Sequence, residues 1–533
     1  MGSLFLLQAP FPKEEVHMSR IAVEHLTFAY ESNPEPVFED VSFSFDTDWK
    51  LGLIGRNGRG KTTLLQLLLG TYDCGGRIAG TVPMQYFPFP LSPGQERYSF
   101  ADLLPEVLPE TAEWEVLSSA ADLSLPAECL WRPFGTLSSG EKTKLMLAAL
   151  FAGERSFLLL DEPTNHLDEA SREAVKRFLA KKKSFLLVSH DRDLLDACVD
   201  HLLVLNRTSI ETVQADYSTW RKNREQTDRF REAENEKHLQ EIRKLKKSLE
   251  ETKRWADRSE STKIGFDPVK EHDRSVSTRS WIGSKTKKLS KRAKAAEKRI
   301  GREMEEKEGL LSDIEKTEDL KLFPLAFRRE VLLRTRDLSV SRGDGSALFS
   351  PLTFEIRQGE RIRISGPTGC GKSSLLRAVL EAAGFQNALP AGLAAFGTCE
   401  VPGGLVISYV PQDTSFLAGT PEDYCLAHGL EKHLFFMLLS KLGVPRGIFS
   451  QPMEHFSEGQ RKKVLTAASL LTSAHLYIWD EPLNYMDVFS REQVEDLVLT
   501  FRPTLLFVEH DVRFGEKIRM REIRLEKPEK RQS

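Results

Sequence analysis

The sequence GRNGRGKT, residues 55–62, decides the fold of this chain. It follows an apolar, strand-like stretch, residues 51–54, and precedes a helix-like run, residues 63–69. The pattern G-x-x-x-x-G-K-[ST] between a strand and a helix predicts a loop that wraps a phosphate group, because its glycines leave backbone N–H groups free to point at an anion. Such a match arises by chance in roughly one protein of this length in fifty, so one copy alone is weak evidence.

A second copy of the pattern, GPTGCGKS, occupies residues 366–373, again between a strand-like and a helix-like stretch. Three further patterns recur in the same order: SSGE at 138–141 and SEGQ at 457–460, an apolar strand ending in Asp-Glu-Pro at 161–163 and 480–482, and His-Asp at 190–191 and 510–511. The copies lie 311 to 320 residues apart. A near-constant separation over four motifs indicates an internal duplication, and hence two nucleotide sites.

Each short motif also has an ordinary structural interpretation. A strand that ends in Asp-Glu-Pro is by itself commonly a turn, and a lone His-Asp is usually a solvent-exposed polar pair or a helix cap. The spacing argues against that interpretation, because Gly140 precedes Asp161 and Gly459 precedes Asp480 by the same 21 residues.

Composition restricts the class of protein. The chain has 533 residues, 40% apolar and 29% charged, with a net charge of -3, which is ordinary for a soluble globular protein of about three to four domain-sized units. No apolar run approaches the roughly 20 residues that span a bilayer. The six cysteines form no C-x-x-C pair, which argues against zinc or a disulfide framework and favours a reduced cytoplasm.

The N-terminal part combines an unpatterned leader with strand-like sequence. Residues 1–18 are predicted to be a disordered leader, or Met18 is the true start. Residues 21–23, 26–30 and 41–45 follow, and the alternation in the last of these suits a half-buried antiparallel sheet.

These motifs together resemble the nucleotide-binding domain of ABC ATPases, and two such domains on one chain resemble the ABC-F family of ribosome-associated ATPases. The segments WRPF (131–134), TDWKLGLIGRNGRGKT (47–62) and YIWDEPLNY (477–485) are similar to the Lsa-type antibiotic-resistance subgroup. The resemblance covers residues 19 to about 525. It implies an α/β fold: two tandem ABC-type nucleotide-binding domains, each a P-loop NTPase core plus an antiparallel β subdomain, joined by a long α-helical hairpin linker. The expected boundaries are 1–18 leader, 19–216 first domain, 217–325 linker with a basic tip, 326–527 second domain and 528–533 tail.

The expected cofactors are ATP and Mg²⁺, and the site residues divide by role because phosphoryl transfer is mostly positioning and charge neutralisation. Glu162 and Glu481 are expected to polarise the attacking water as general bases, and His190 and His510 to sense the γ-phosphate. The expected metal ligands are Thr62, Asp161, Ser373, Asp480 and Gln412. Nucleotide contacts are expected from Tyr30, Gly55, Asn57, Gly58, Gly60, Lys61, Thr62, Thr63, Gly366, Thr368, Gly369, Gly371, Lys372, Ser373, Ser374, Gln412, Ser138, Gly140, Ser457 and Gly459.

The resemblance also implies that each signature helix serves the opposite site. Site one would join Lys61, Thr62, Asp161 and Glu162 to Ser457 and Gly459, and site two would join Lys372, Ser373, Asp480 and Glu481 to Ser138 and Gly140. ATP would then hold the two halves together and hydrolysis would release them, as in a clamp.

Three positions depart from the family pattern, so the two sites are predicted to be unequal. Arg342 stands in the second half where Tyr30 would stack on adenine in the first, although a guanidinium also stacks. Phe89 stands where the second half has Gln412, and Glu458 replaces a signature glycine.

The segment between the two halves is charged and helix-favouring. Apolar residues Leu239, Ile242, Leu245 and Leu249 in the run 217–252, and a similar seam in the run 287–316, predict an antiparallel helical hairpin with its tip at 253–286. About 36 residues would project it roughly 50–55 Å. Residues 274–302 hold eleven Lys or Arg against one acid, Glu297, which suggests RNA phosphate contacts, with Trp281 and Phe266 as stacking groups. The plainer alternative is a solvated coiled-coil linker.

By resemblance, the linker would enter the ribosomal exit-tRNA site, contact 23S rRNA and peptidyl tRNA, and help to eject pleuromutilin, lincosamide or streptogramin A drugs. The chain would be a cytoplasmic monomer whose two domains pair with each other, without a membrane partner. The short stretch between Phe89 and Ser138 and the short tail predict a compact member. Three alternatives stay open: a translation factor without a resistance role, the ATPase subunit of a transporter, and a non-hydrolysing scaffold.

Overall fold

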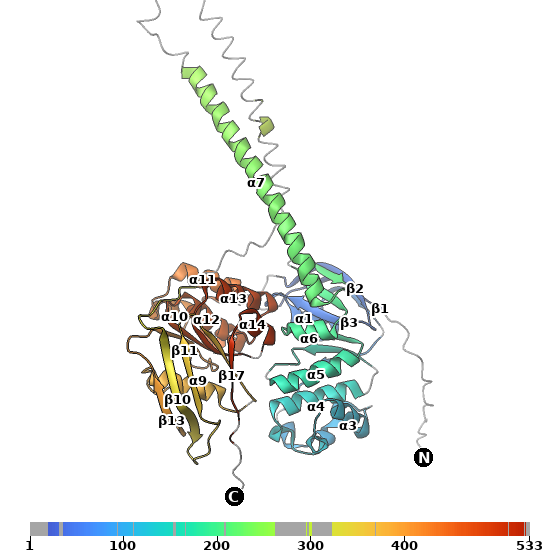
Figure 1. The fold of residues 1–533 in the computed structure, drawn as a ribbon. Helices are drawn as coiled ribbons and strands as arrows, with labels where there is room; N and C mark the ends of the chain where they lie inside the picture. Colours follow the sequence, from blue (N-terminus) through green and yellow to red (C-terminus); the bar gives the residue numbers. More distant parts are fainter. Residues whose placement is uncertain are drawn as a thin grey trace, which may run out of the picture. The chain divides into compact units, whose positions relative to one another are not determined.

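A computed structural model describes residues 20–30, 36–80, 82–92, 94–109, 111–152, 156–165, 167–206, 209–261, 295, 298–300, 322–367, 369–509, 511–526 and 528. The chain divides into two compact units (Figure 1). One unit comprises Met1–Ser218 with Asp319–Ser533, and the other comprises Thr219–Glu318.

The first ATPase domain is built on a six-stranded sheet. Its strand order is β5-β6-β7-β3-β8-β9, and all neighbours are parallel except β8 and β9. The central strands are continuous apolar runs, as expected for strands covered by helices on both faces. The strands are β3 (Lys50–Gly55), β5 (Met84–Phe87), β6 (Phe157–Asp161), β7 (Phe185–Val188), β8 (His201–Leu205) and β9 (Ile210–Val213).

A small antiparallel sheet accompanies this core and confirms the predicted β subdomain. Its order is β2-β1-β4, formed by β1 (Arg20–Phe28), β2 (Phe38–Asp46) and β4 (Gly75–Ala79). Alternate residues of β2 are buried, among them Val41, Phe43 and Phe45, as the sequence pattern predicts. The ring of Phe45 packs against that of Phe157 in β6, with centroids 5.4 Å apart, so the two sheets share one core.

The helices of this domain include one that follows the phosphate loop and one that follows the signature motif, as expected. They are α1 (Lys61–Leu68), α2 (Phe100–Val107), α3 (Glu113–Asp122), α4 (Ser139–Ala152), α5 (Glu169–Lys181) and α6 (Arg192–Cys198). Gly60, just before α1, has φ 87°, and a Cβ there would lie 2.5 Å from Val37 Cγ1. Only glycine fits this left-handed, crowded position.

The second domain repeats the architecture. Its larger sheet, β14-β15-β16-β12-β17, is parallel throughout, and its smaller sheet, β11-β10-β13, is antiparallel. The strands are β10 (Val331–Arg342), β11 (Leu352–Arg357), β12 (Arg361–Ser365), β13 (Leu393–Glu400), β14 (Ile407–Val410), β15 (Leu476–Asp480), β16 (Leu505–Val508) and β17 (Arg521–Arg524). The helices are α9 (Lys372–Ala382), α10 (Pro421–Ala427), α11 (Lys432–Lys441), α12 (Glu458–Leu471), α13 (Val488–Phe501) and α14 (Val512–Lys517).

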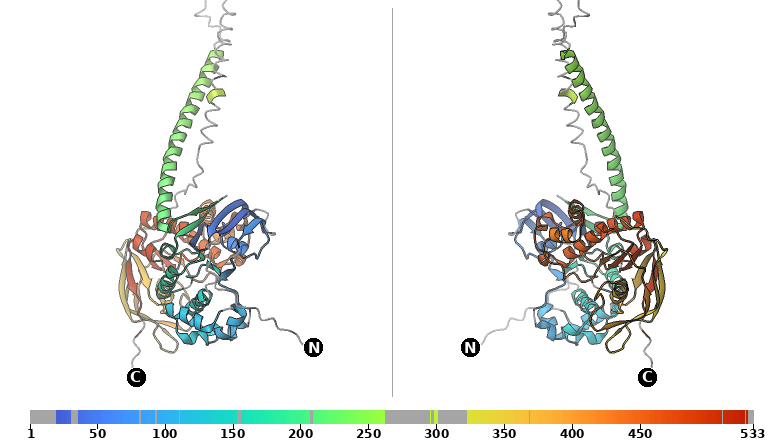
Figure 2. Two further views of the ribbon diagram at one scale, coloured as in Figure 1. Left: turned by 90° about the vertical axis from the view of Figure 1, so that its right-hand side faces the viewer. Right: turned by 90° about the vertical axis from the view of Figure 1, so that its left-hand side faces the viewer.

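Among the described residues, the helix α7 (Tyr217–Ser261) begins at the end of the first unit and continues through the second, and it runs unbroken in both orientations of Figure 2. At 45 residues it measures about 68 Å. It corrects one expectation, because the helix continues nine residues past Thr252 into the predicted tip. That stretch, residues 253–261, contains no proline or glycine to stop it.

Most of the predicted return helix and the rest of the basic tip, including Trp281 and Phe266, lie outside the described residues. Leu245 of the predicted seam is half-buried and Ile300 is buried. Within the described ranges, none of the helices combines the length and apolar character that a membrane span requires.

Charged side chains join the two ATPase domains. Arg192 of α6 pairs with Glu495 of α13, whose side chain is fully buried, and lies 3.4 Å from Asp511 Oδ2. Arg513 of α14 pairs in return with Asp193 and, at 2.5 Å, with Asp196. A buried ion pair fixes the position of one surface relative to the other, because moving either surface would leave a buried charge without its partner.

Arg192→Met tests this network, because it leaves the buried carboxylate of Glu495 with Lys517 as its remaining cation. Removing one partner of a buried pair costs about 3–5 kcal/mol. We expect the free energy of unfolding, from urea titration followed by tryptophan fluorescence, to fall by about 3 kcal/mol.

The control is Arg334→Met, which removes a partly exposed pair with Glu355 (3.2 Å) and should cost less than about 1 kcal/mol. Equal losses in the two variants would contradict a stabilising role for the network between the domains.

Candidate functional site

Both phosphate-binding loops have the predicted shape. Gly58, Gly60, Gly369 and Gly371 have positive φ, between 74° and 95°, and each loop ends at a lysine that begins a helix. Lys61 Nζ donates to the carbonyl oxygen of Gly55 (2.8 Å), and Lys372 Nζ donates to that of Gly366 (2.9 Å). Each ammonium group therefore lies over its own loop, where a phosphate would be held. Thr368 lies outside the described residues.

In the first domain, three side chains meet at the end of β6. Thr62 Oγ1 and the Tyr86 hydroxyl both donate to Asp161 Oδ2, at 2.8 and 3.0 Å. Burial raises the pKa of Asp161, and these two hydrogen bonds oppose the rise. Tyr86 was not among the predicted site residues. It precedes by three residues Phe89, which packs toward Phe100 with centroids 6.1 Å apart.

In the second domain, the equivalent carboxylate has fewer partners. Asp480 is fully buried, and among the described residues neither of its carboxylate oxygens has a partner within hydrogen-bond distance. Burial raises the pKa of Asp480 to about 6, although nearby Ser373 opposes this. The Ser373 hydroxyl instead donates to Gln412 Oε1 at 3.3 Å. A buried carboxylate without donors, beside a hydroxyl and an amide oxygen, is a donor set that suits a hard divalent cation such as Mg²⁺.

The two predicted general bases share an unusual backbone conformation. Glu162 has φ 51° and Glu481 has φ 52°, in the left-handed region that non-glycine residues seldom adopt. Each N–H donates to the last residue of the neighbouring strand, Val188 or Val508, at 2.9 Å. This conformation costs about 1–3 kcal/mol and is typical of functional sites, so its occurrence in both copies supports the predicted pair.

Glu162 lies against His190. The ring Nε2 of His190 is 3.3 Å from Glu162 Oε1, and its backbone N–H donates to Glu162 Oε2 at 3.3 Å. Burial, together with Lys61 and Arg491, holds the pKa of His190 well below its usual range, so the ring is neutral. Burial and Asp161 raise the pKa of Glu162 to about 8, close to the working pH that favours a proton acceptor.

Glu481 has different neighbours. Asn484 Nδ2 donates to Glu481 Oε2 at 2.6 Å, and Gln412 Nε2 lies 3.4 Å from the same oxygen. His510, the predicted counterpart of His190, lies outside the described residues. Among the described residues, the hydrogen-bond partners of the two carboxylates therefore differ; the kinetic inequality expected from Phe89 and Gln412 stays a prediction.

Each signature serine caps its helix. Ser457 Oγ accepts from the Gln460 N–H at 3.3 Å while Gln460 Oε1 accepts from the Ser457 N–H at 2.9 Å, and Ser138 forms the same reciprocal pair with Glu141. Gly459 has a steric reason to be glycine, because a Cβ there would lie 2.7 Å from Tyr485 Cβ. The Tyr485 hydroxyl donates to Glu458 Oε2 at 3.1 Å, which gives the unusual Glu458 a partner.

The first phosphate loop contacts the second domain directly. Asn57 N–H donates to Asp487 Oδ2 at 3.0 Å, and Asn57 Nδ2 donates to the carbonyl oxygen of Tyr485 at 2.8 Å. Since Tyr485 also touches Gly459, one residue connects the first loop to the second signature. This arrangement agrees with the predicted composition of site one.

The predicted adenine-stacking residue lies in an aromatic cluster. The ring of Tyr30 is 5.0 Å from Phe28 and 5.9 Å from Tyr72, and its hydroxyl shares a hydrogen bond with Thr63 Oγ1 (2.8 Å). Arg342, its counterpart in the second domain, ends β10 as an exposed side chain.

A buried lysine that sequence reasoning missed distinguishes the two domains. Lys462 Nζ, on the signature helix α12, donates to the carbonyl oxygens of Pro411 (2.6 Å) and Asp480 (2.5 Å). It therefore ties α12 both to the segment that carries Gln412 and to the end of β15. A lysine five positions after Ser457 on the buried face of a helix is the signal that could have revealed it.

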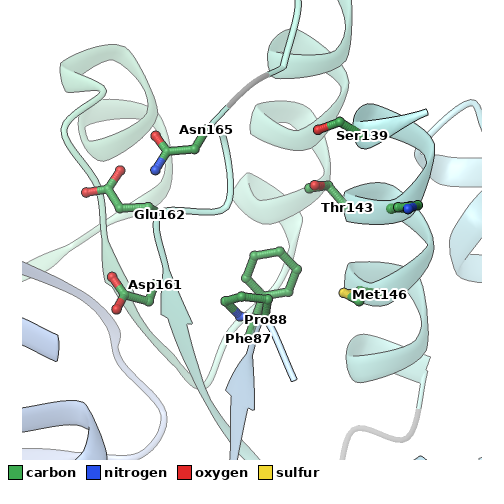
Figure 3. A pocket seen from close by; sticks show the side chains of 9 residues that line it. Phe87, Pro88, Ser139, Thr143, Met146, Asp161, Glu162 and Asn165 are labelled. Atoms are coloured by element: carbon green, nitrogen blue, oxygen red, sulfur yellow. The ribbon is translucent and has the colours of Figure 1, made fainter. Parts of the chain in front are cut away.

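The first domain has Thr143 at the position of Lys462, and a cavity takes the place of the lysine. The cavity, of about 380 Å³, is lined by residues that include Phe87, Thr143, Met146, Asp161 and Glu162. Figure 3 shows Thr143 and Met146 of α4 facing Asp161 and Glu162 across it. The link between signature helix and metal-site strand is thus present in the second domain and replaced by open space in the first.

Comparisons with known proteins match this architecture. A family model described as "ABC transporter" matches residues 38–165 and 349–484. "Ribosome protection protein VmlR" of Bacillus subtilis (strain 168) is 28% identical over 494 residues, which cover 92% of this chain and 84% of that protein. "ABC transporter F family member 3" of Arabidopsis thaliana is 26% identical over 407 residues, 75% of this chain and 51% of that protein.

Among solved structures, "RNase-L Inhibitor" aligns with a TM-score of 0.56 and 19% identity over 94% of this chain and 88% of that chain. At this identity the likeness concerns the fold. It confirms the expected tandem arrangement of two ABC-type domains on one chain.

Lys462→Met tests the link described above, because methionine keeps the length and removes the donors. Two buried carbonyl groups would lose their partner, and an unsatisfied buried group costs about 1–3 kcal/mol. We expect kcat for ATP hydrolysis to fall about tenfold, measured as steady-state phosphate release, with partial recovery in Lys462→Arg.

Lys432→Met is the matched control, since it removes an exposed lysine of α11 that pairs with Glu422 and is not among the predicted site residues. An unchanged kcat in Lys462→Met, or an equal fall in Lys432→Met, would show that Lys462 has no particular part in the reaction.

Proposed function

Because the chain belongs to the ABC-F group of ATPases, we propose that it binds the ribosome and uses ATP to protect it from antibiotics at the peptidyl-transferase centre. The observation that carries this proposal is the direct contact of the first phosphate loop with the second domain, where Asn57 donates hydrogen bonds to Asp487 and Tyr485. The similarity to a ribosome protection protein over 92% of the chain supports the proposal that this chain acts on the ribosome.

Mg²⁺ fits the residues present. Asp161 with Thr62 would hold it in site one, and Asp480 with Ser373 and Gln412 in site two. The unpartnered oxygens of Asp480 are the observation that supports this assignment. When bound there, Mg²⁺ would supply positive charge against the negative charge that develops on the transferring phosphate.

The remaining steps fall to the chain's own residues. Lys61 and Lys372 leave their loop carbonyls to bind the phosphates, and the glycine N–H groups surround them. Glu162 and Glu481 orient water and accept its proton. His190, neutral beside Glu162, donates a hydrogen bond toward the γ-phosphate, and we assign the same role to His510.

ATP binding would move the two domains toward each other. Ser457 and Gly459 complete site one, and Ser138 and Gly140 complete site two, so both sites are whole only when the domains meet. The remaining nucleotide contacts are those expected from the sequence: Tyr30, Thr63, Thr368 and Ser374.

The linker is the part that we propose contacts RNA. α7 is long enough, at about 68 Å, to reach from a surface-bound ATPase unit into a ribosomal cavity. The basic run 274–302 supplies cations for 23S rRNA or peptidyl tRNA in the exit-tRNA site. We propose that the ribosome is protected against pleuromutilins, lincosamides and streptogramin A drugs.

The double variant Glu162→Gln with Glu481→Gln tests the ATPase part of the proposal. Glutamine keeps the shape and cannot accept a proton, so we expect phosphate release to fall at least about 100-fold while ATP stays bound. In ATP the variant should sediment with ribosomes. Glu173→Gln, on the exposed face of α5, is the control and should behave like the unmodified protein.

Sedimentation of the double variant with membranes instead would support a transporter subunit and contradict the proposal. Unaltered phosphate release would show that the two glutamates are not the catalytic bases.

Expression in a susceptible strain tests the protective role. We expect the inhibitory concentrations of pleuromutilins, lincosamides and streptogramin A to rise at least about fourfold, and the rise to disappear with the double variant, because protection needs ATP turnover. Unchanged inhibitory concentrations with normally expressed protein would favour a translation factor without a resistance role.

A further inference from the structure

Three arginines gather where the parallel strands of the second domain begin. Arg361 opens β12, which lies between β16 and β17 in the sheet, with Arg361 opposite Leu505 and Ile362 opposite Arg521. Arg502 lies three residues before β16 and Arg519 two residues before β17. All amino ends of a parallel sheet share one edge, so Arg502 and Arg519 flank Arg361. We call these three residues the arginine edge.

The cations of the arginine edge are not neutralised within the described part of the chain. None of the three side chains forms an ion pair or hydrogen bond there, and Arg361 Nε is buried without a partner. Burial lowers the pKa of Arg361, and the charges of Arg502 and Arg519 lower it further. Like charges this close repel, so the arrangement is unfavourable until an anion joins it.

The nearby carboxylates are occupied by other groups. Glu360 accepts from the backbone N–H of Arg357 (2.8 Å) and lies 3.7 Å from Arg521. Glu330 and Glu355 pair with the Arg357 side chain at 3.2 and 2.6 Å. Glu516, one turn before Arg519, forms no ion pair with it in the described structure. The acids around this edge therefore do not compensate its charge.

Two residues of the arginine edge also have an unfavourable backbone conformation. Arg502 has φ 47° and Arg519 has φ 51°, in the left-handed region where glycine or asparagine is normal. Each costs about 1–2 kcal/mol relative to an ordinary conformation. The chain thus places an unpaired cation at two positions where a neutral turn residue would be more stable.

The first domain shows that the fold does not require such a cluster. Lys50 opens the corresponding strand, β3, and its Nζ donates to the carbonyl oxygen of Ala180 at 2.6 Å. Asp200 lies at the same edge, accepting from the Lys50 N–H at 3.1 Å and pairing with His201. Lys50 is thus tied to a carbonyl oxygen beside an acid, with Lys181 and Lys183 exposed nearby, whereas the corresponding Arg361 in the second domain has a buried Nε without a partner in the described part of the chain.

The segment that follows the linker in sequence also runs along this edge. Pro324 pairs with Ala474, just before β15, and Gln358 Nε2 donates to the carbonyl oxygen of Phe327 at 2.7 Å. The exposed Arg328 and Arg329 come next in this segment. The positive surface is therefore continuous with the segment that leads back from the linker.

We propose that the arginine edge binds backbone phosphates of ribosomal RNA, as a second contact besides the linker. The inference rests on the proposed ribosome binding and adds to it a surface on the ATPase unit itself. Guanidinium groups bind phosphate oxygens in pairs, and an RNA backbone presents phosphates at a density that three clustered cations can match. Such contacts position the protein without reading sequence.

The double variant Arg502→Ala with Arg519→Ala tests the proposal, because both side chains are exposed and lie outside the ATP sites. Binding of the full chain to purified ribosomes and to purified ribosomal RNA is measured in ATP over a range of salt concentrations. We expect affinity to fall about tenfold for both, and the slope of log affinity against log salt to fall by about one to two.

Two controls accompany the experiment. Lys181→Ala with Lys183→Ala removes two exposed cations near the same edge of the first domain and should leave affinity and slope unchanged. ATP hydrolysis without ribosomes should be the same in all three proteins.

The outcomes are distinct. If the unmodified chain bound no ribosomes, the proposed function itself would fail. If the arginine variant bound ribosomes with unchanged affinity and slope, the arginine edge would have no part in a chain that still binds. A loss on ribosomes without a loss on purified RNA would assign the edge to an acidic ribosomal protein and overturn the proposal.

Discussion

Carboxylates buried at the carboxyl ends of two parallel sheets are the constraint on which the rest of the structure depends. Taking such a charge out of water costs several kcal/mol unless donors or a cation compensate it. Asp161 is compensated in part by hydrogen bonds from Thr62 and Tyr86, whereas in the described part of the chain both Asp480 oxygens lack a partner within hydrogen-bond distance and only nearby Ser373 offsets the effect of burial.

Buried charges are also compensated by opposite charges at the contact between the two domains. Arg192 reaches both Glu495 and Asp511, and Asp511 caps the helix that follows His510. Burial alone would raise the pKa of Asp511, but Arg491 and Arg192 together keep it below its ordinary value. A cation from the first domain thus stabilises the segment beside the predicted γ-phosphate sensor of the second, which gives the two sites a physical route of communication.

The two copies differ in how the signature helix is attached to the sheet. Lys462 ties the second signature helix to the second metal-site strand, and that helix also carries Ser457 and Gly459 of site one. With Thr143 in its place, the first domain has a cavity and no such tie. The two copies therefore differ in how the signature helix is held to the strand that ends in Asp-Glu.

Sequence patterns predicted those structural features that are determined by residues close together in the chain. The phosphate loops and the strand that ends at Asp161 follow from glycine spacing and apolar runs, which are properties of neighbouring residues, whereas the caps made by Ser138 and Ser457 were not predicted. The extent of α7 was underestimated, because charged residues after Thr252 resemble a loop yet favour a helix equally well.

Contacts between distant residues could not be predicted in the same way. Nothing near Arg192 in sequence indicates that its partner is Glu495, and Tyr86 is a site residue only because β5 lies beside β6. Lys462 looks like one more charged residue on a surface helix until the fold buries it. Cross-domain pairing and the burial of single polar groups depend on the complete fold, so they require a structure.

The most direct test of the account is the number of ATP molecules held per chain when hydrolysis is blocked. The double variant Glu162→Gln with Glu481→Gln would be passed through a sizing column with Mg²⁺ and ATP, and its bound nucleotide and molar mass measured together. The account predicts two ATP molecules on a monomer of 60.4 kDa, because each site is completed by the other domain of the same chain. One ATP per chain, or retention only by a dimer of chains, would contradict it.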